Sequence, residues 1–380
     1  MKTLQILGNT AFGGATRLVL DWCKYLNQKG WTVEVLTTDG QTGLELKKID
    51  NIVIQDGILI PREIDPVQDI RAALALYRLI KSGKYDVVHT YSATPSFIGR
   101  LAGFLAGVPV VHHQAGWTIN EANSPAKKIL FQSLEAAAIC MSSRSICVSH
   151  AIAAQGKALP LIPKAKLTTI CNGITVKPLL EAPPAASRER LCDELGISKS
   201  ACLIGNTGRL AAQKDPATLI RAVSELKKDV PNRDIKLLLV GEGPERETLA
   251  ALVETLGLHD EVRFLGFRSD IPEFLASLDV FASPSLWEGL SISILEAMAA
   301  KKPIVASSIP PNSELIEHEV TGLLVPETSP KELARAIQRF ISDTELAKRC
   351  AQAAQTKVLE HYTIERMFAE TYQLYLDLLA

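Results

Sequence analysis

The sequence predicts an α/β protein with two doubly wound domains, each built around a parallel sheet. Strand-like runs and helical patterns alternate along the whole chain. The strand-like runs are apolar on both faces, as in parallel strands that helices cover on both sides. The length of 380 residues is also more than one hydrophobic core usually supports. We therefore expect two Rossmann-like domains of similar size.

The first half of the chain contains short β-rich runs separated by helical patterns. A clear helical pattern covers residues 15–30, where apolar residues recur at helical spacing and Gly30 follows as a stop. The expected strands of this half are residues 4–8, 32–38, 86–91, 109–113, 145–149 and 167–171.

The rhythm breaks at residues 176–191, where three prolines and a rise in charge indicate a linker. It then restarts with expected strands at 202–208, 235–241, 262–266, 278–284 and 302–308. This organisation places a first domain at residues 1–178, a linker at 179–200 and a second domain at 201–358. In such sheets, ligands bind beyond the carboxyl ends of the strands, here in the cleft that two facing domains would form.

The composition is that of a globular protein, with 47% hydrophobic and 22% charged residues. A net charge of −1 gives no indication of a nucleic-acid partner. Seven cysteines without a C-x-x-C pair indicate buried thiols in a reducing compartment rather than disulfides or a zinc site.

The chain start enters a strand without a signal-like segment, and the apolar stretch 97–111 contains Arg100, three glycines and a proline. We expect a cytoplasmic protein, with contact to the inner face of a membrane left open.

Four stretches at strand ends contain residues suited to an anionic ligand. Gly13 and Gly14 precede a helix, whose N–H groups could face a phosphate, although a plain strand-to-helix turn has the same appearance. Arg209 and Lys214 follow a strand and precede another helix, and both side chains can bind phosphate oxygens. Exposed basic residues in loops are, however, often merely solvated.

The third stretch, residues 237–249, ends a strand in a tight turn containing Gly241. Together with residues 264–270 it could line a nucleobase pocket, where backbone groups around Phe267 and Arg268 would hydrogen-bond a base edge. The fourth stretch, residues 283–299, contains Glu288 and Glu296 with seven residues between them. A buried helix does not require carboxylates, so this pair needs an explanation.

Taken together and in order, these stretches resemble the retaining glycosyltransferases of family 4, which have the GT-B fold and include glycogen-synthase-like nucleotide-sugar transferases. The resemblance covers nearly the whole chain and is strongest over residues 203–330. It includes GRLAAQKD, LLLVGEGPER, VRFLGFRSD, KPIVAS and HEVTGLLVP. The E-x7-E element within SPSLWEGLSISILEAMA is the most diagnostic feature.

The resemblance implies specific roles in the binding of a nucleotide-diphosphate sugar. It assigns Glu288 to the hydroxyls of the donor sugar and Glu296 to the nucleotide ribose. Arg209 and Lys214 would neutralise the diphosphate. Other positions implied at the donor are Gly13, Gly14, Gly241, Phe267, Arg268 and the backbone amides of Gly289, Leu290, Ser291 and Ile292.

One position departs from the family pattern. Members usually carry a histidine just before a glycine after the fourth or fifth strand, and the register places Ala115 there. His113 lies two residues earlier and would point to the same face of a continuing strand. Our hypothesis is that His113 replaces the missing histidine near the donor sugar and the acceptor hydroxyl. The alternative is a histidine that only bonds nearby backbone.

The function implied is a retaining, metal-independent transfer of a hexose-type group from a UDP- or GDP-sugar to a hydroxyl acceptor. The implied catalytic residues are His113, Glu288, Arg209 and Lys214, with no cofactor and no metal ligands. The acceptor could belong to polysaccharide, glycolipid or glycoconjugate synthesis. In this fold a C-terminal helix, here residues 359–380, returns to the first domain.

Three other functions come into question. Glycoside hydrolysis is disfavoured, because eight helical steps of ~1.5 Å separate the two glutamates by roughly 12 Å along the axis, whereas retaining hydrolases hold two carboxyls ~5–5.5 Å apart. A catalytically degenerate binding subunit and a sugar-nucleotide epimerase of similar fold stay open. At residues 125–138, Lys127 and Lys128 lie beside apolar residues, which suits either a membrane-surface helix or an ordinary packed helix.

Overall fold

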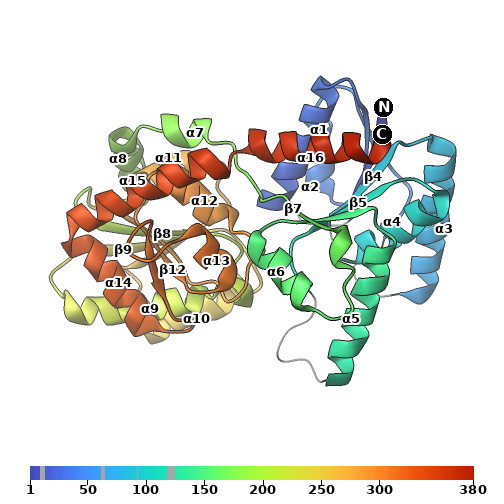
Figure 1. Cartoon of the computed structure of the whole chain (residues 1–380). Helices are drawn as coiled ribbons and strands as arrows, with labels where there is room; N and C mark the ends of the chain where they lie inside the picture. Colours follow the sequence, from blue (N-terminus) through green and yellow to red (C-terminus); the bar gives the residue numbers. More distant parts are fainter. Residues whose placement is uncertain (9–12, 61–64, 92, 118–124) are drawn as a thin grey trace. The chain divides into compact units, whose positions relative to one another are not determined.

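The computed structural model describes residues 1–8, 13–60, 65–91, 93–117 and 125–380. The chain forms two compact units, each an α/β structure around one parallel sheet (Figure 1). The first unit contains Met1–Cys171 and Met367–Ala380, and the second contains Asn172–Arg366. The α/β class with two parallel sheets, predicted from the sequence, is confirmed.

The sheet of the first unit has the strand order β3-β2-β1-β4-β5-β6-β7 over the described residues, and neighbouring strands are parallel. Strands β2 and β3 follow β1 on one side and strands β4 to β7 follow on the other, so the order reverses between β1 and β4. Their bounds are β1 Lys2–Gly8, β2 Thr32–Thr37, β3 Ile52–Gln55, β4 Val87–Thr90, β5 Val110–Gln114, β6 Arg144–Cys147 and β7 Leu167–Thr169.

The helices of the first unit cover this sheet and include the end of the chain. The last helix packs on the first one through aromatic rings: Trp22 meets Phe368 at 5.2 Å and Tyr375 at 5.4 Å between ring centroids. The bounds are α1 Gly14–Gln28, α2 Gly40–Leu46, α3 Pro66–Gly83, α4 Ala93–Ala106, α5 Pro125–Cys140, α6 His150–Ala158, the 3-10 turn η1 Lys164–Lys166 and α16 Ile364–Leu379, which enters the unit at Met367.

The sheet of the second unit has the order β10-β9-β8-β11-β12-β13 over the described residues, again with parallel neighbours. Its order reverses between β8 and β11, so it repeats the arrangement around β1 and β4. The bounds are β8 Cys202–Thr207, β9 Ile235–Val240, β10 Val262–Gly266, β11 Val280–Ser283, β12 Ile304–Ser307 and β13 Leu323–Val325.

The helices of the second unit have strongly apolar inner faces. In α9, for example, Leu219, Val223 and Leu226 are fully buried, and each such side chain contributes about 1.5–3 kcal/mol on leaving water. The bounds are α7 Lys177–Glu181, α8 Pro184–Leu195, η2 Ala212–Lys214, α9 Pro216–Asp229, α10 Arg246–Thr255, α11 Ile271–Ser277, α12 Ile292–Ala299, α13 Pro310–Leu315, α14 Pro330–Ser342 and α15 Thr344–His361.

The segment 179–200, expected as a linker, lies within the second unit and is largely helical. Pro178 and Pro184 occupy the first turns of α7 and α8, where a missing N–H group costs nothing. The Arg188 side chain then fixes α8 to the unit: its Nη1 donates to the Ser277 carbonyl at 2.9 Å and to Asp279 at 3.1 Å. The prolines here begin helices rather than interrupt structure.

Two edge strands, β3 and β13, were absent from the strands expected from the sequence. Both are short, and β3 leaves Val53 47% exposed. A strand with one neighbour needs less apolar surface than a central strand, so its hydrophobic pattern in the sequence is weak.

No helix in the described part of the chain combines the length and apolar character needed to cross a membrane.

Lys302 lies just before β12 in the second unit, and only 9% of this residue is exposed. Its Nζ donates to the carbonyls of Ala276 at 2.6 Å and Leu278 at 3.1 Å. These are carbonyls at the end of α11, where a cation is favourable. Burial nevertheless dominates and lowers the pKa of Lys302 to about 8.

Replacing Lys302 by methionine is expected to remove a pH dependence of stability. Between pH 8 and the ordinary lysine value of about 10.5, the unfolded chain holds a proton that the folded chain has lost. The free energy of unfolding therefore rises with pH in this window, by at most about 1.4 kcal/mol per pH unit, and this gain is lost as the pH falls through about 8. Urea unfolding at several pH values measures the difference between wild type and Lys302→Met.

The exposed neighbour Lys301 provides the matched control. Lys301→Met should follow the wild-type pH dependence of unfolding. Parallel curves for wild type and Lys302→Met between pH 8 and 10.5 would contradict the prediction.

Candidate active site

The point where the strand order reverses positions the expected residues of the second unit. Strands β8 and β11 are neighbours, but the chain leaves them in opposite directions along the sheet. The loops after two such strands diverge and leave room for a ligand at their carboxyl ends. Arg209 and Lys214 follow β8, and Glu288 follows β11. The strand topology therefore places these three residues at one edge of the sheet.

Lys214 and Glu288 form an ion pair at this edge, between Nζ and Oε1. The Glu288 side chain is 6% exposed and that of Lys214 is 20% exposed, so the pair is largely removed from water. The two loops are also joined by Gln213, whose carbonyl accepts from Leu286 N at 2.8 Å and whose Nε2 donates to the Trp287 carbonyl at 2.9 Å. The carboxylate and the ammonium are thus held in place together.

Arg209 is exposed on the same loop and lies just after Gly208. The loop after β8 packs backbone to backbone on the loop after β9. Gly208 N donates to the Val240 carbonyl at 2.9 Å, and Leu210 N donates to the Glu242 carbonyl at 3.0 Å. A Cβ at Gly241, whose φ is 133°, would lie 1.9 Å from the Gly208 oxygen. Gly241 is therefore required by this close approach of two loops.

Phe267 and Arg268 differ in their surroundings. The Phe267 side chain is 58% exposed beside the end of β10. Arg268 forms two ion pairs, with Glu194 of α8 at 2.6 Å and with Asp270 at 2.7 Å. The hydrogen bonds to Asp270 and Glu194 raise the pKa of the guanidinium. The Arg268 side chain therefore fixes its own loop, and what it leaves for a ligand is the backbone of this loop.

The stretch between the two glutamates is part loop and part helix. Helix α12 begins at Ile292, so Glu288 lies before the helix and Glu296 lies in its second turn. Ser291 is the N-cap, and its hydroxyl accepts from Ile294 N at 3.4 Å. The amides around Ile292 therefore form the amino end of the helix, which favours negative charge. Glu296 is half-buried.

Buried polar groups that the sequence analysis did not single out support the Glu288 loop. Asn206 Nδ2 donates to the Ala282 carbonyl at 2.7 Å. The Ser307 hydroxyl donates to the Ser285 carbonyl, and Asn312 Nδ2 donates to the Ser307 carbonyl at 3.0 Å. All these side chains are buried. A signal was present in the sequence, because Asn206 and Ser307 are polar residues at the ends of apolar strands.

In the first unit, Gly13 and Gly14 lie at the amino end of α1, which follows the central strand β1. A Cβ at Gly13 would meet no atom of the described residues within 4 Å. The preceding residues 9–12 of the expected glycine loop lie outside the described residues.

His113 lies on β5 and is half-buried, and Ala115 is exposed just after the strand. The His113 ring is 6.2 Å from the His89 ring and 5.7 Å from the Tyr91 ring, between centroids. His89 is 2% exposed, and burial together with the nearby His113 lowers its pKa well below the ordinary value. His113 thus belongs to a cluster of rings at the ends of β4 and β5.

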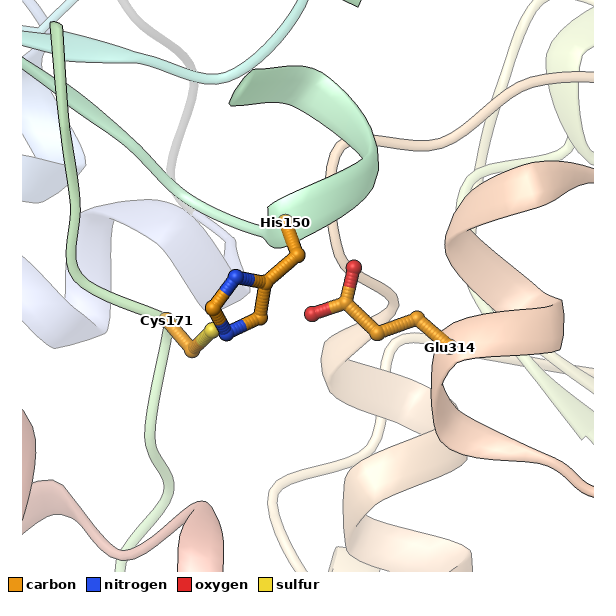
Figure 2. A group of neighbouring side chains, drawn as sticks. All are labelled: His150, Cys171 and Glu314. Atoms are coloured by element: carbon orange, nitrogen blue, oxygen red, sulfur yellow. The ribbon is translucent and has the colours of Figure 1, made fainter. Parts of the chain in front are cut away.

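His150 and Cys171 are also neighbours in the first unit, at the start of α6 and after β7 (Figure 2). A ring nitrogen of His150 and the Sγ of Cys171 lie within 4.8 Å. Glu314, drawn in the same figure, belongs to the second unit. Two ligands are too few for a structural zinc site. All seven cysteines have free thiols, and those at 23, 147, 192, 202 and 350 are buried.

Two protein-family models match the chain and together span most of it. The first, described as Glycosyltransferase Family 4, matches residues 12–177. The second, described as Glycosyl transferases group 1, matches residues 187–357.

Similar proteins extend over both units. The chain is 29% identical to an Escherichia coli protein named UDP-Gal:alpha-D-GlcNAc-diphosphoundecaprenol alpha-1,3-galactosyltransferase, over 83% of this chain and 82% of that protein. It is 26% identical to the D-inositol 3-phosphate glycosyltransferase of Kineococcus radiotolerans, over 90% and 86% of the two chains.

Solved structures share the fold. The structure of Anabaena HepE in complex with UDP-glucose has a TM-score of 0.82 and 24% identity, over 98% of this chain and 99% of that chain. A glycosyltransferase from Rickettsia africae has a TM-score of 0.83 and 23% identity, over 100% and 98%. The resemblance and the GT-B fold stated from the sequence are confirmed, and we conclude that the chain belongs to the glycosyltransferases of family 4, with a group 1 glycosyl transferase region in its second half.

Proposed function

We propose that the protein is a retaining, metal-independent glycosyltransferase that moves a hexose-type group from a UDP- or GDP-sugar to a hydroxyl acceptor. The observation that carries this proposal is the Lys214–Glu288 pair at the strand-order reversal of the second sheet, just before the amino end of α12. It agrees with the names of two similar proteins, a UDP-Gal-dependent galactosyltransferase and a structure in complex with UDP-glucose.

The charges of the second unit suit a nucleotide-diphosphate leaving group. Arg209 and Lys214 offer two cations, and the amides of Gly289, Leu290, Ser291 and Ile292 surround the start of α12. Negative charge develops on the diphosphate as the bond to the sugar breaks, and fixed donors stabilise it without reorganisation. These groups would supply the stabilisation that a divalent cation supplies in metal-dependent transferases.

The two glutamates would bind the neutral parts of the donor. The ion pair with Lys214 orients the Glu288 carboxylate, which can accept hydrogen bonds from sugar hydroxyls. On donor binding, Lys214 would turn its charge toward the diphosphate while the sugar satisfies Glu288. Glu296, which lies in the second turn of α12, would accept hydrogen bonds from the ribose hydroxyls. The backbone at Phe267 and Arg268 would face the base.

Donor binding predicts a thermal shift that depends on Lys214. A nucleotide sugar at 100 times its Kd should stabilise the protein by about 2.7 kcal/mol. A screen of UDP-, GDP- and ADP-sugars by differential scanning fluorimetry measures the shift in Tm. In Lys214→Met the shift should be largely lost, because one of two diphosphate cations is removed.

Lys227→Met is the matched control, because Lys227 also forms an ion pair with a glutamate, Glu261, in the same unit. This variant should keep the full ligand-induced shift. The proposal is wrong if no nucleotide sugar stabilises the wild-type protein. Equal shifts in Lys214→Met and wild type would reject the role of Lys214 alone.

His113 would act on the other half of the reaction, near the donor sugar and the acceptor hydroxyl. It lies at the carboxyl end of β5, where Ala115 takes the place of the usual histidine of the family. Turnover by the isolated chain would also exclude a degenerate binding subunit, and dependence on an acceptor would exclude an epimerase.

His113→Ala is expected to lower kcat by about 100-fold or more, the lower end of a general acid–base contribution. The KM for the donor should change little, because the proposed contacts to the diphosphate and the ribose are made by Arg209, Lys214 and Glu296 rather than by His113. Initial rates with a responsive donor measure both constants. The exposed His259→Ala is the control and should retain wild-type rates. A decrease of only a few-fold in His113→Ala would rule out this role.

We propose a membrane-bound acceptor, because α5 exposes apolar side chains although part of its last turn is buried. Its residues Ile129, Leu130 and Leu134 are 64%, 55% and 46% exposed, and Lys127 and Lys128 precede them. In Figure 1 the helix extends away from the sheet of its unit. Apolar side chains beside lysines suit an anionic lipid surface, and the similar galactosyltransferase is named for a diphosphoundecaprenol acceptor.

Anionic vesicles are therefore expected to bind the protein through α5. Sedimentation with phosphatidylglycerol vesicles should recover the wild-type protein, and Ile129→Asn with Leu130→Asn should reduce the bound fraction several-fold, since both side chains are exposed and their loss leaves the core intact. Leu180→Asn, which replaces a 46% exposed leucine of the second unit, is the control. Equal binding by all variants, or none by wild type, would contradict the proposal.

A further inference from the structure

A chain of buried polar groups links the C-terminal helix α16 to His113 within the first unit. Tyr375 of α16 is fully buried, and its hydroxyl lies 2.8 Å from Nδ1 of His89 on β4. His89 pairs across the sheet with Gln5 on one side and with Val111 on the other. His113 is two residues beyond Val111 on β5, so its side chain lies on the same face as His89.

The hydrogen bonds around Gln5 determine where the protons lie. Thr3 Oγ1 donates to the Val87 carbonyl at 2.9 Å, so it must accept from Gln5 Nε2, which lies 2.8 Å away. These two bonds fix the orientation of the Gln5 amide. Gln5 Oε1 is then the acceptor for the Tyr91 hydroxyl at 2.6 Å.

The same reasoning gives the tautomer of His89. The Tyr91 proton is committed to Gln5, and Gln5 Nε2 also faces the Tyr375 oxygen at 3.4 Å. The Tyr91 oxygen also lies 3.1 Å from His89 Nδ1, but its proton is already used, so the Tyr375 hydroxyl at 2.8 Å is the remaining hydroxyl donor to this nitrogen. A neutral imidazole that accepts at Nδ1 carries its proton on Nε2. His89 is neutral here, because burial lowers its pKa well below the ordinary value.

The oriented imidazole of His89 and the Tyr91 ring lie beside His113. The His89 ring stacks on the Tyr91 ring at 4.3 Å, and the His113 ring lies 6.2 Å from one and 5.7 Å from the other, within the range of ring contacts. Nε2 of His89 is buried and has no hydrogen-bond partner among the described residues. His89 therefore presents a neutral N–H group, rather than a positive charge, to its surroundings.

Packing alone does not explain the Tyr375 hydroxyl. The ring already packs against Trp22 at 5.4 Å and Trp31 at 5.5 Å, which a phenylalanine would do equally well. A buried hydroxyl needs a hydrogen-bond partner, and its shortest such contact here is with His89 Nδ1 at 2.8 Å.

We infer that Tyr375 is a positioning residue for the transfer reaction: its hydroxyl holds His89 neutral with the proton on Nε2, and His89 with Tyr91 holds the His113 ring in place. This rests on the proposed role of His113. The C-terminal segment thus completes the part of the site that belongs to the first unit. Tyr375 and His89 are 286 residues apart in sequence.

Tyr375→Phe in the full chain tests the inference, with Tyr372→Phe as the matched control. Tyr372 lies on the same helix, and its ring packs edge-on against Tyr25 at 6.0 Å. Nitrogen-15 NMR of histidine-labelled protein reports the tautomer of His89, which His89→Gln assigns. The wild type and Tyr372→Phe should show the proton on Nε2, and Tyr375→Phe should show a mixture or the other tautomer.

Kinetics supply the second readout. Tyr375→Phe should lower kcat at least 10-fold and shift the pH profile of kcat, with the KM for the donor within 2-fold of wild type. A lower Tm with an unchanged pH profile and an unchanged kcat would show a merely structural role and overturn the inference. A wild-type His89 proton on Nδ1 would overturn it as well.

The variant His113→Ala separates this inference from the proposed function. If His113→Ala is defective but Tyr375→Phe has wild-type kinetics, the inference fails and the role of His113 stands. If His113→Ala turns over normally, the role of His113 fails, and the inference that depends on it fails too. A defect in both, with the tautomer change in Tyr375→Phe alone, supports both.

Discussion

The parallel direction of all strands is the constraint on which both halves of the candidate site depend. When neighbouring strands run the same way, their carboxyl ends meet at one edge, and the following loops compete for the space above it. The competition is relieved where the strand order reverses, between β1 and β4 and between β8 and β11. Gly13 and Tyr91 follow the first pair of strands, and Lys214 and Glu288 follow the second. The topology thus selects the positions before the side chains select the chemistry.

At the second of these points an ion pair joins the loops after β8 and β11. A carboxylate with 6% exposure loses most of its hydration, and one lysine replaces it. Removing one partner of such a pair leaves an uncompensated charge, which costs more than the pair itself contributes. The buried Asn206, Ser307 and Asn312 then hold the backbone between β11 and Glu288. These polar contacts therefore help to hold the loop in place.

The sequence predicted the central strands, the two sheets and the positions of the charged residues at strand ends, because each depends on local pattern. It missed β3 and β13, where an edge strand needs little apolar surface, and it treated the prolines of α7 and α8 as a break. It could not show that Arg268 binds Glu194, a residue 74 positions away. It also could not connect Tyr375 with His89, because neither helical periodicity nor strand pattern reports a contact between distant elements. Local order was readable, and long-range polar pairing was not.

The two units use the same topology for opposite electrostatic tasks. The second unit places Arg209, Lys214 and a helix amino end at its sheet edge, which suits a ligand that carries and gains negative charge. The first unit places rings there, and burial keeps His89 and His112 neutral by lowering their pKa values. The hydroxyl acceptor proposed above is uncharged, so it does not need a cation as a partner. Neutral groups with fixed proton positions can instead donate or accept in one defined direction. For the reaction proposed above, the cations of the second unit suit the leaving group, and the neutral imidazoles of His89 and His112 suit an uncharged acceptor.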